Sequence, residues 1–220
     1  MHQLRLRAVG VAAGLALSAG ALFFGQAQAV ASSWSVVSSP NSGTSNNYLS
    51  GIACVSSSFC IAVGAYDYGA LIESWNGTSW SIVASPNRGL GDNNLFGASC
   101  LLPKTCTAVG IGTGQTLIES LNGSRWSIAP SPSSGTSYNS LYGVACPSFK
   151  SCTAVGGVGN GTQFLIESGK HNRWSIESTP NTGNYNALTS VACVSSGSCT
   201  AVGYYVNSSS GVFQTLIVSE

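Results

Sequence analysis

The sequence predicts an all-β fold, a β-propeller of four four-stranded blades of roughly 46 residues each. Four tryptophans recur at intervals of 46, 46 and 48 residues, and four cysteines recur at intervals of 46, 46 and 47. The segments between them are short and apolar, and Gly, Pro and Asn residues separate them. A unit of four short strands that repeats every roughly 40–50 residues is the period of a propeller.

The first 29 residues have the three parts of a secretory signal peptide. Met1–Arg7 carries two arginines and no acid, Ala8–Phe24 is apolar, and small residues at 27 and 29 suit signal peptidase. We therefore predict a signal peptide over 1–29 and a secreted domain over 30–220. A membrane anchor is the alternative, because the apolar run lies at the short end of the length that spans a bilayer.

The composition excludes some classes of partner. Charged residues are 7% of the chain, and the domain after cleavage carries six basic and seven acidic side chains. A weakly charged chain with no basic run has no electrostatic footprint for nucleic acid or for anionic membranes. We therefore expect no nucleic acid partner. No segment after the signal peptide is long enough and apolar enough to span a bilayer, so we also expect no membrane insertion once the signal peptide is removed.

The second repeat marks the strands within one unit. Its four apolar or β-branched segments are separated by turn residues, and they are Leu95–Cys100, Cys106–Ile111, Thr116–Glu119 and Trp126–Ile128. Asn122-Gly123 stands between the third and fourth segments. Asn-Gly suits a two-residue type I′ hairpin turn, because both of its central residues need positive φ. Several strands are apolar on both faces, which is expected of a blade covered by neighbours on both sides.

The phase of the repeat predicts how the ring closes. Residues 34–37 match a fourth strand and residues 214–219 match a third strand, with no fourth-strand segment after them. The N-terminal strand is therefore predicted to complete the last blade, which would remove an exposed sheet edge. The alternatives are half of an eight-bladed ring built by two chains, or a fragment of a larger array. We accordingly expect a monomer or a ring-forming dimer.

All eight cysteines fall in pairs separated by five residues. The pairs are Cys54/Cys60, Cys100/Cys106, Cys146/Cys152 and Cys193/Cys199. Each pair flanks the turn between the first and second strands, so one disulfide per blade is predicted. A metal site would need thiolates in a reducing compartment and usually tighter spacing. We therefore expect no metal and no other cofactor.

One turn resembles a motif of a known family. Residues 74–80, Ser-Trp-Asn-Gly-Thr-Ser-Trp, resemble the Asp-box of sialidase-like propellers, although Asn replaces Asp and the turn is one residue shorter. The repeat length is also similar to that of secreted bacterial-type short-repeat lectin propellers. The resemblance implies a propeller but not sialidase activity. The arginine cluster of those enzymes is not matched, because the domain has only Arg88, Arg125 and Arg173.

Catalytic groups should break the repeat, since a single active site uses each group once. Glu73, Glu119 and Glu167 obey the repeat, so we expect them to be structural hydrogen-bond acceptors. No nucleophile-elbow, P-loop, dinucleotide-binding or zinc-protease motif occurs. We therefore expect no enzymatic activity. The alternative is a glycoside hydrolase that uses the acid pair Asp67 and Asp92.

Tyrosines break the repeat on one predicted face. The connections from second to third strand and from fourth to first strand open on that face, and blades 1 and 4 become neighbours if the ring closes. The predicted ligand-binding residues are Tyr66, Asp67, Tyr68, Tyr185, Tyr204, Tyr205 and Asn207. Such side chains can stack on sugar rings or anchor a protein. The sequence predicts a secreted, non-catalytic binding module for a glycan or an extracellular protein, with a structural or protein-interaction propeller of the cell envelope as the alternative.

Overall fold

The computed structural model describes residues 33–135, 138–159, 162–170, 173–180 and 184–220. The chain divides into two units, Met1–Val36 and Val37–Glu220, and the predicted signal peptide lies outside the described residues. Within the described ranges, no helix is long and apolar enough to cross a membrane. The unit Val37–Glu220 is all β.

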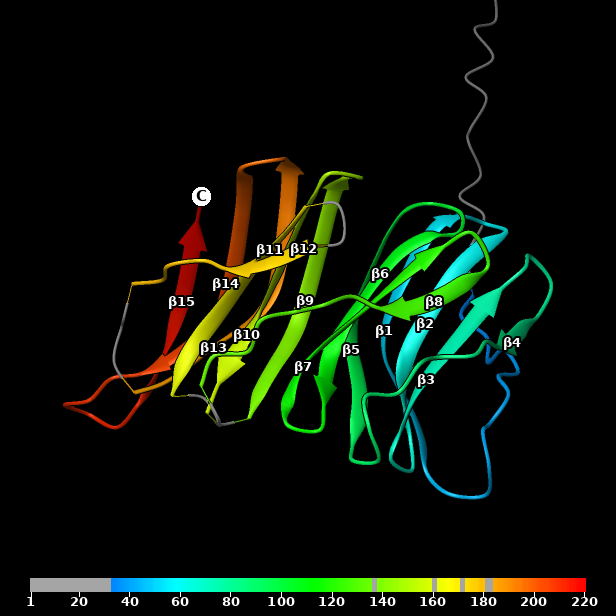
Figure 1. Cartoon of the computed structure of the whole chain (residues 1–220), viewed down its shortest axis with the longest axis horizontal. Coiled ribbons are helices and arrows are strands. Elements are labelled where there is room, and N and C mark those ends of the chain that lie inside the picture. The colour runs from blue at the N-terminus through cyan, green and yellow to red at the C-terminus, as the bar shows by residue number, and fades with distance from the viewer. Residues whose placement is uncertain (1–32, 136–137, 160–161, 171–172, 181–183) are drawn as a thin grey trace, which may run out of the picture. The chain divides into compact units, whose positions relative to one another are not determined.

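Four antiparallel sheets follow one another along the chain (Figure 1), and we call them blades 1 to 4. In the described part of the chain, blades 1 to 3 have four strands and blade 4 has three. The strands are β1 (Asn47–Ser56), β2 (Phe59–Tyr66), β3 (Gly69–Trp75), β4 (Trp80–Ile82), β5 (Asn93–Leu102), β6 (Thr105–Gly112), β7 (Gln115–Asn122), β8 (Arg125–Ile128), β9 (Asn139–Ser148), β10 (Ser151–Val158), β11 (Gln163–Lys170), β12 (Arg173–Ile176), β13 (Asn184–Ser195), β14 (Ser198–Val206) and β15 (Phe213–Ser219). Within each blade, every strand pairs with its neighbour in sequence, as the repeat predicts.

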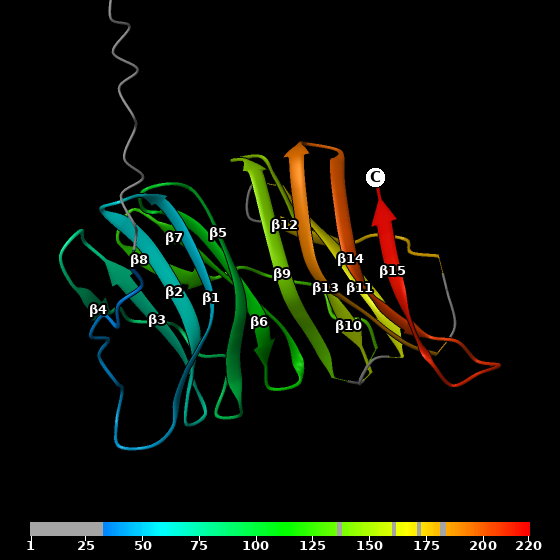
Figure 2. The same ribbon diagram turned by 180° about the vertical axis from the view of Figure 1, so that it is seen from behind.

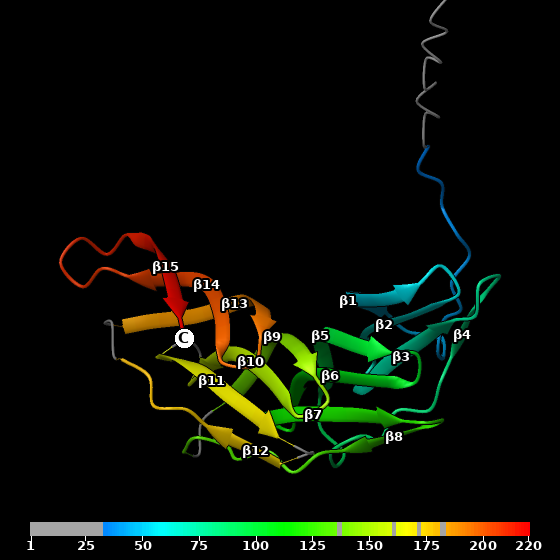
Figure 3. The ribbon, with the colours of Figure 1, turned by 90° about the horizontal axis from the view of Figure 1, so that it is seen from above.

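The blades lie side by side in chain order (Figure 2). The first strands of successive blades contact each other, β1 with β5, β5 with β9, and β9 with β13. Blades 1 and 4 therefore lie at opposite ends of the row, which is clearest from above (Figure 3).

Both faces of a blade are apolar, and successive blades pack on each other through these faces. Val63 and Ile72 lie opposite each other on β2 and β3, so they share the face of blade 1 that points toward blade 2. They belong to one buried cluster with Leu95, Ala108 and Leu117 of blade 2. We call the face of a blade that points toward the next blade, such as that of Val63, its leading face. The face that points toward the preceding blade, such as that of Leu95 in blade 2, is its trailing face.

The same contact recurs along the row. Val109 and Ile118 of blade 2 cluster with the trailing face of blade 3, and Val155 of blade 3 clusters with the trailing face of blade 4. The trailing-face residues are Leu141, Ala154 and Leu165 in blade 3, and Leu188, Ala201 and Leu216 in blade 4. Three interfaces in Val37–Glu220 are therefore built from equivalent positions of the repeat.

Glycine allows the first strands of neighbouring blades to approach closely. A Cβ atom on Gly97 would lie 2.8 Å from the carbonyl oxygen of Tyr142 in the next blade, and one on Gly51 would lie 2.6 Å from that of Phe96. A Cβ atom on Gly143 would lie 3.1 Å from the Cα atom of Ser190 in blade 4. These glycines recur at equivalent positions because a side chain there would push the blades apart.

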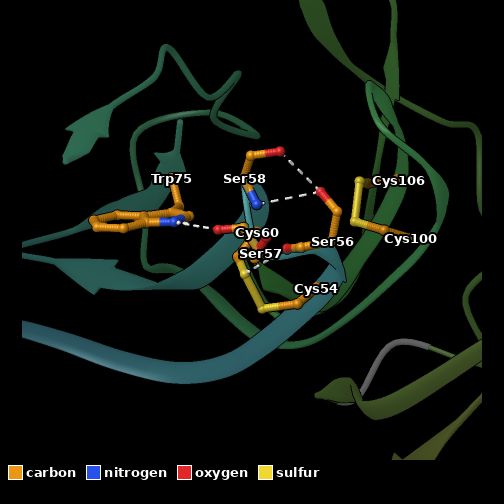
Figure 4. Close-up of a disulfide and its surroundings, with 8 residues drawn as sticks. All are labelled: Cys54, Ser56, Ser57, Ser58, Cys60, Trp75, Cys100 and Cys106. Atoms are coloured by element: carbon orange, nitrogen blue, oxygen red, sulfur yellow. Dashed lines mark hydrogen bonds between the residues drawn. A yellow bond between two sulfur atoms is a disulfide. The ribbon is translucent and has the colours of Figure 1, made fainter. Parts of the chain in front are cut away.

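The predicted disulfide pairing is confirmed. The two residues of each bonded pair lie opposite each other across the first hairpin of a blade, with Cα atoms 4.0 to 4.1 Å apart. Figure 4 shows the bridge of blade 1, beside which the indole nitrogen of Trp75 donates a hydrogen bond to the carbonyl oxygen of Ser57 at 3.0 Å. The disulfides therefore hold the end of each first hairpin. The four bonds are Cys54–Cys60, Cys100–Cys106, Cys146–Cys152 and Cys193–Cys199.

Three of the bridges reach into the interior of the domain. Cys60, Cys106 and Cys199, the second cysteines of blades 1, 2 and 4, are buried. The Cys199 sulfur also lies 3.4 Å from the hydroxyl oxygen of Thr153 in blade 3, so this bridge takes part in the contact between blades 3 and 4. Because they are buried, these cysteines are not available to contact a ligand at the surface. Their role is therefore structural.

The predicted closing strand is not formed. Residues 33–40 contain no strand, and blade 4 ends at β15. The Ser39 hydroxyl donates to the carboxylate of Glu73 in blade 1. Blades 2 and 3 lie between blade 1 and β15, and sheets pack roughly 10 Å apart. Ser39 is therefore held on blade 1, at the end of the row opposite to β15.

The close approach at Gly97 predicts a specific loss of stability. The Gly97→Ala variant should unfold about 1–3 kcal/mol more easily, because its methyl group overlaps the Tyr142 carbonyl and forces blades 2 and 3 apart. Gly157→Ala is the matched control, since a Cβ there meets nothing closer than 3.5 Å. Chemical denaturation of the oxidised proteins measures both variants. Equal stability of the two variants would contradict the proposed blade contact.

Candidate ligand-binding face

Turns and linkers are joined by backbone hydrogen bonds along one edge of the row, both between blades and within a blade. The Asn93 N–H donates to the carbonyl of Tyr68 in the preceding blade at 3.0 Å, and the Thr113 N–H donates to the carbonyl of Asp92 at 2.9 Å. Tyr68 lies in the turn between β2 and β3, and Asp92 ends the linker between β4 and β5. The two kinds of connection therefore share one face, as predicted, and we call it the loop face.

A buried asparagine shapes the linker into blade 2. The Asn93 side-chain oxygen accepts from the Arg88 N–H at 2.7 Å, and its amide group donates to the carbonyls of Gly91 at 2.6 Å and Tyr68 at 3.3 Å. Asn47 makes corresponding bonds to Ser42 in the segment before blade 1. The repeated Asn of the Asn-x-Leu element therefore fixes the shape of a loop.

An open groove lies on the loop face where blades 1 and 2 meet. One part has a volume of about 540 Å³, and its lining includes Tyr48, Tyr66, Asp67, Tyr68, Asp92, Asn94 and Phe96. A second part of about 420 Å³ shares Tyr68, Asp92 and Asn94 with the first and extends to Leu90, Thr113 and Tyr138. We call the two parts together the tyrosine groove. It spans three blades, because Tyr138 directly precedes β9.

The three predicted residues of blade 1 all line this groove. The side chain of Tyr68 is 70% exposed, and Asp67 is also exposed. The Tyr66 ring packs on the backbone of Gly69, where an added Cβ would lie 2.8 Å from two ring atoms. Tyr66 is therefore partly used in packing, and Tyr68 presents the free ring. Asp67 adopts a φ of 44°, which a tight turn between β2 and β3 requires.

The predicted residues of blade 4 lie away from the tyrosine groove, at the other end of the row. Tyr185 is exposed at the start of β13, with a φ of 56°. Tyr205 packs against the apolar cluster between blades 3 and 4. Tyr204 is exposed, and its ring meets that of Phe213 edge-on at 5.3 Å. The structure therefore does not bring the blade 1 and blade 4 residues together.

Asn207 has a local role in its turn. Its side-chain oxygen accepts hydrogen bonds from the backbone N–H groups of Ser209 at 2.9 Å and Ser210 at 3.2 Å. This is the usual way in which Asn organises a turn. The Asn207 side-chain oxygen, which was predicted to contact a ligand, therefore already accepts hydrogen bonds from the backbone of its own turn.

Sequence reasoning missed part of the groove. Asp92, Asn94 and Phe96 contribute to its lining from blade 2, whereas only blade 1 and blade 4 residues were predicted. The sequence signal that could have found them is their position at the end of the linker into the first strand of blade 2. That linker lies on the loop face beside the turn that carries Tyr68. Asp92 was considered only as a partner of Asp67, and both carboxylates do line the same groove.

The repeated glutamates have the structural role that the repeat predicted. In each of blades 1 to 3, a serine hydroxyl from the segment leading into the blade donates to a buried carboxylate on its third strand. The pairs are Ser39–Glu73, Ser85–Glu119 and Ser131–Glu167, with shortest oxygen–oxygen distances of 2.8, 3.0 and 2.7 Å. Burial raises the pKa of Glu119 to about 8 and that of Glu167 to about 7. These carboxylates pin the linkers and lie away from the loop-face groove.

Another hollow of about 360 Å³ lies between blades 2 and 3, beside two disulfides. Ser, Thr and Leu side chains and Trp174 line much of it, and none of its lining residues is charged. In the ranges that the structure describes, no three His, Cys, Asp or Glu side chains gather so as to hold a metal ion.

Comparison with known proteins supports the fold. No family model and no curated protein matches the sequence. A solved structure described as "Structure of U3-55K" has a TM-score of 0.50 and 8% identity, over 78% of this chain and 53% of that one. "Crystal structure of RRP9 WD40 repeats" gives a TM-score of 0.48 and 10% identity over the same shares. The first is a WD40 β-propeller, and its similarity supports a β-propeller fold for this chain. The chain spans about half the length of each of the two structures.

The buried glutamates predict a pH dependence of stability. An acid whose pKa is higher in the folded state lowers the free energy of unfolding as pH rises from its unfolded value to its folded value. For Glu119 this window runs from 4.5 to about 8. Glu119→Gln should therefore reduce the fall in melting temperature between pH 5 and pH 8. Thermal unfolding across that range measures it, and parallel curves for the wild type and the variant would contradict the assignment.

Proposed function

We propose that this protein is a secreted, non-catalytic binding module whose tyrosine groove binds a carbohydrate chain. The observation that carries the proposal is the exposed ring of Tyr68, which lies in one open groove with the carboxylates of Asp67 and Asp92. An aromatic ring offers a flat apolar surface to the C–H groups of a sugar. Carboxylates accept hydrogen bonds from its hydroxyl groups.

The shape of the groove favours a chain over a small enclosed ligand. Its two parts share Tyr68, Asp92 and Asn94, so an extended ligand can pass from Tyr48 in blade 1 to Tyr138 before blade 3. Pockets for small molecules usually bury most of the ligand surface, whereas this groove is open along its length. The lectin-propeller resemblance of the sequence supports the same ligand class.

The groove is held in shape before a ligand arrives. The carbonyl of Tyr68 accepts from both the backbone and the side chain of Asn93. A preorganised site loses less conformational entropy on binding. Two neighbouring blades therefore fix the position of Tyr68.

Secretion is supported by the chemistry of the cysteines. Four disulfides fit an oxidising, extracellular compartment, and the residues at 1–29 have the pattern of a signal peptide. A glycan of a cell surface or an extracellular matrix is therefore a ligand that the protein would meet.

A protein-binding scaffold is the second candidate. The propeller fold of the similar structures favours it, as does the apolar end of blade 4, where Val202, Phe213 and Ile217 are exposed. A glycoside hydrolase is a further alternative, because Asp67 and Asp92 line the same groove. These alternatives predict different results in the binding experiment.

A glycan panel tests the proposed site. The oxidised, secreted chain should bind at least one glycan saturably, and Tyr68→Ala should weaken that binding about tenfold or more, as a central aromatic contact does. Tyr185→Ala is the matched control, since Tyr185 is exposed on blade 4 and does not line the groove. Equal losses in both variants would contradict the blade 1 to blade 2 site.

The same panel separates the alternatives. Binding to no glycan, together with capture of a defined extracellular protein, would overturn carbohydrate recognition in favour of the protein scaffold. Release of reducing ends that is lost in Asp67→Asn or Asp92→Asn would overturn the non-catalytic assignment.

A further inference from the structure

The two ends of the blade row expose residues that are buried between blades elsewhere in the row. At the three interfaces inside Val37–Glu220, the leading-face residues Val63, Val109 and Val155 are fully buried by the next blade. The equivalent residue of blade 4 is Val202, whose side chain is 43% exposed. Ile217 corresponds to Ile72 and is 68% exposed.

The exposed leading face of blade 4 is a continuous apolar surface. Val202 pairs with Ile217 across β14 and β15, and Tyr204 and Phe213 extend the same face toward the loop face. Val194 of β13 is exposed as well. Nothing in the described part of the chain covers this surface, although its equivalents in blades 1 to 3 are interfaces.

Blade 1 carries the complementary half. Leu95, Leu141 and Leu188 are completely buried on the trailing faces of blades 2 to 4, whereas the equivalent Leu49 is 47% exposed. Ile52, further along the trailing face of blade 1, is exposed too. Ala62 and Leu71, which correspond to Ala108 and Leu117 of blade 2, are buried within the chain. The free part of this trailing face therefore lies along β1, at the end of the row opposite to the free leading face.

The position of Ser39 indicates where the segment before it belongs. Ser85 bonds Glu119 of blade 2, and the residues shortly before it form β4, which pairs with β3 of the preceding blade. Ser39 bonds Glu73 of blade 1 in the same way. The residues before it, 34–37, therefore correspond to a fourth strand for a blade that precedes blade 1.

We propose that the protein forms a head-to-tail dimer in which the leading face of blade 4 packs on the trailing face of blade 1 of a second copy. Residues 34–37 of that copy then pair with the free edge of β15. Two such junctions close a ring of eight blades, which lies within the usual propeller range of roughly four to eight. A closed ring leaves neither half of the interface exposed.

The match to longer propellers favours a second copy over closure within one chain. The four blades superimpose on 53% of a longer propeller chain at a TM-score of 0.50. Their arrangement is thus compatible with a ring of more than four blades, in which a second copy can supply the further blades. Only 7% of the residues are charged, so two copies of the chain repel each other little when they come into contact.

One residue makes the new junction differ from the internal ones. Ser190 stands on the leading face of blade 4 where Gly51, Gly97 and Gly143 stand in the other blades. Its Cβ would meet the first strand of the next blade, so the first strands lie further apart at this junction. The junction should therefore be weaker than the internal interfaces, and Ser190→Gly should lower the dissociation constant of the dimer.

The oligomeric state of the oxidised, secreted chain tests the proposal. Sedimentation or light scattering should give twice the monomer mass. Ile217→Asp and Leu49→Asp should each give monomers, with the dimer dissociation constant raised at least a hundredfold. Leu102→Asp is the matched control, because Leu102 is also exposed but lies on neither face at the ends of the row, and it should remain dimeric. Circular dichroism confirms that each variant is folded.

Mixing the two variants identifies the geometry of the contact. An Ile217→Asp chain keeps an intact blade 1, and a Leu49→Asp chain keeps an intact blade 4, so the equal mixture should form a heterodimer through one intact junction. A monomeric wild type, polymers larger than the dimer, or a Leu49→Asp variant that dimerises alone would overturn the proposal. Loss of the dimer in Leu102→Asp would overturn it as well. None of these measurements depends on glycan binding.

Discussion

The fold depends on the contact between the leading face of one blade and the trailing face of the next. A single blade is a small sheet that is apolar on both sides, and such a sheet is not stable alone in water. Val109 and Ile118 are buried only because blade 3 covers them with Leu141 and Leu165. Glycine at positions such as Gly97 brings the first strands close enough for this packing. The strands, turns and linkers are arranged around that repeated contact.

The same arrangement separates structural polar groups from those available for binding. The buried carboxylates of Glu73, Glu119 and Glu167 accept from linker serines inside the blade stack, where a ligand does not reach them. The exposed tyrosines and aspartates lie on the loop face, where turns of one blade and linkers of the next are bonded together. The interior therefore repeats almost identically, and the variation between blades is concentrated on the loops.

Local features of this fold could be predicted from the sequence, and distant pairings could not. The strands and the disulfides follow from spacings within one repeat, such as the five residues between Cys193 and Cys199. Closure of the ring depends on whether residues 34–37 meet β15, which the period alone does not decide. The lining of the tyrosine groove was predicted in part. Tyr68 is exposed and lines the tyrosine groove, whereas Tyr205 is partly buried against the cluster between blades 3 and 4, because a repeat does not reveal the side of a strand on which a ring lies.

The central claim is that equivalent faces of successive repeats pack on each other. Nuclear Overhauser effects between labelled methyl groups of the oxidised chain test it most directly. The account predicts cross-peaks between the methyl groups of Val109 or Ile118 in blade 2 and those of Leu141 or Leu165 in blade 3. Cross-peaks from these groups that stay within a single repeat would contradict the account.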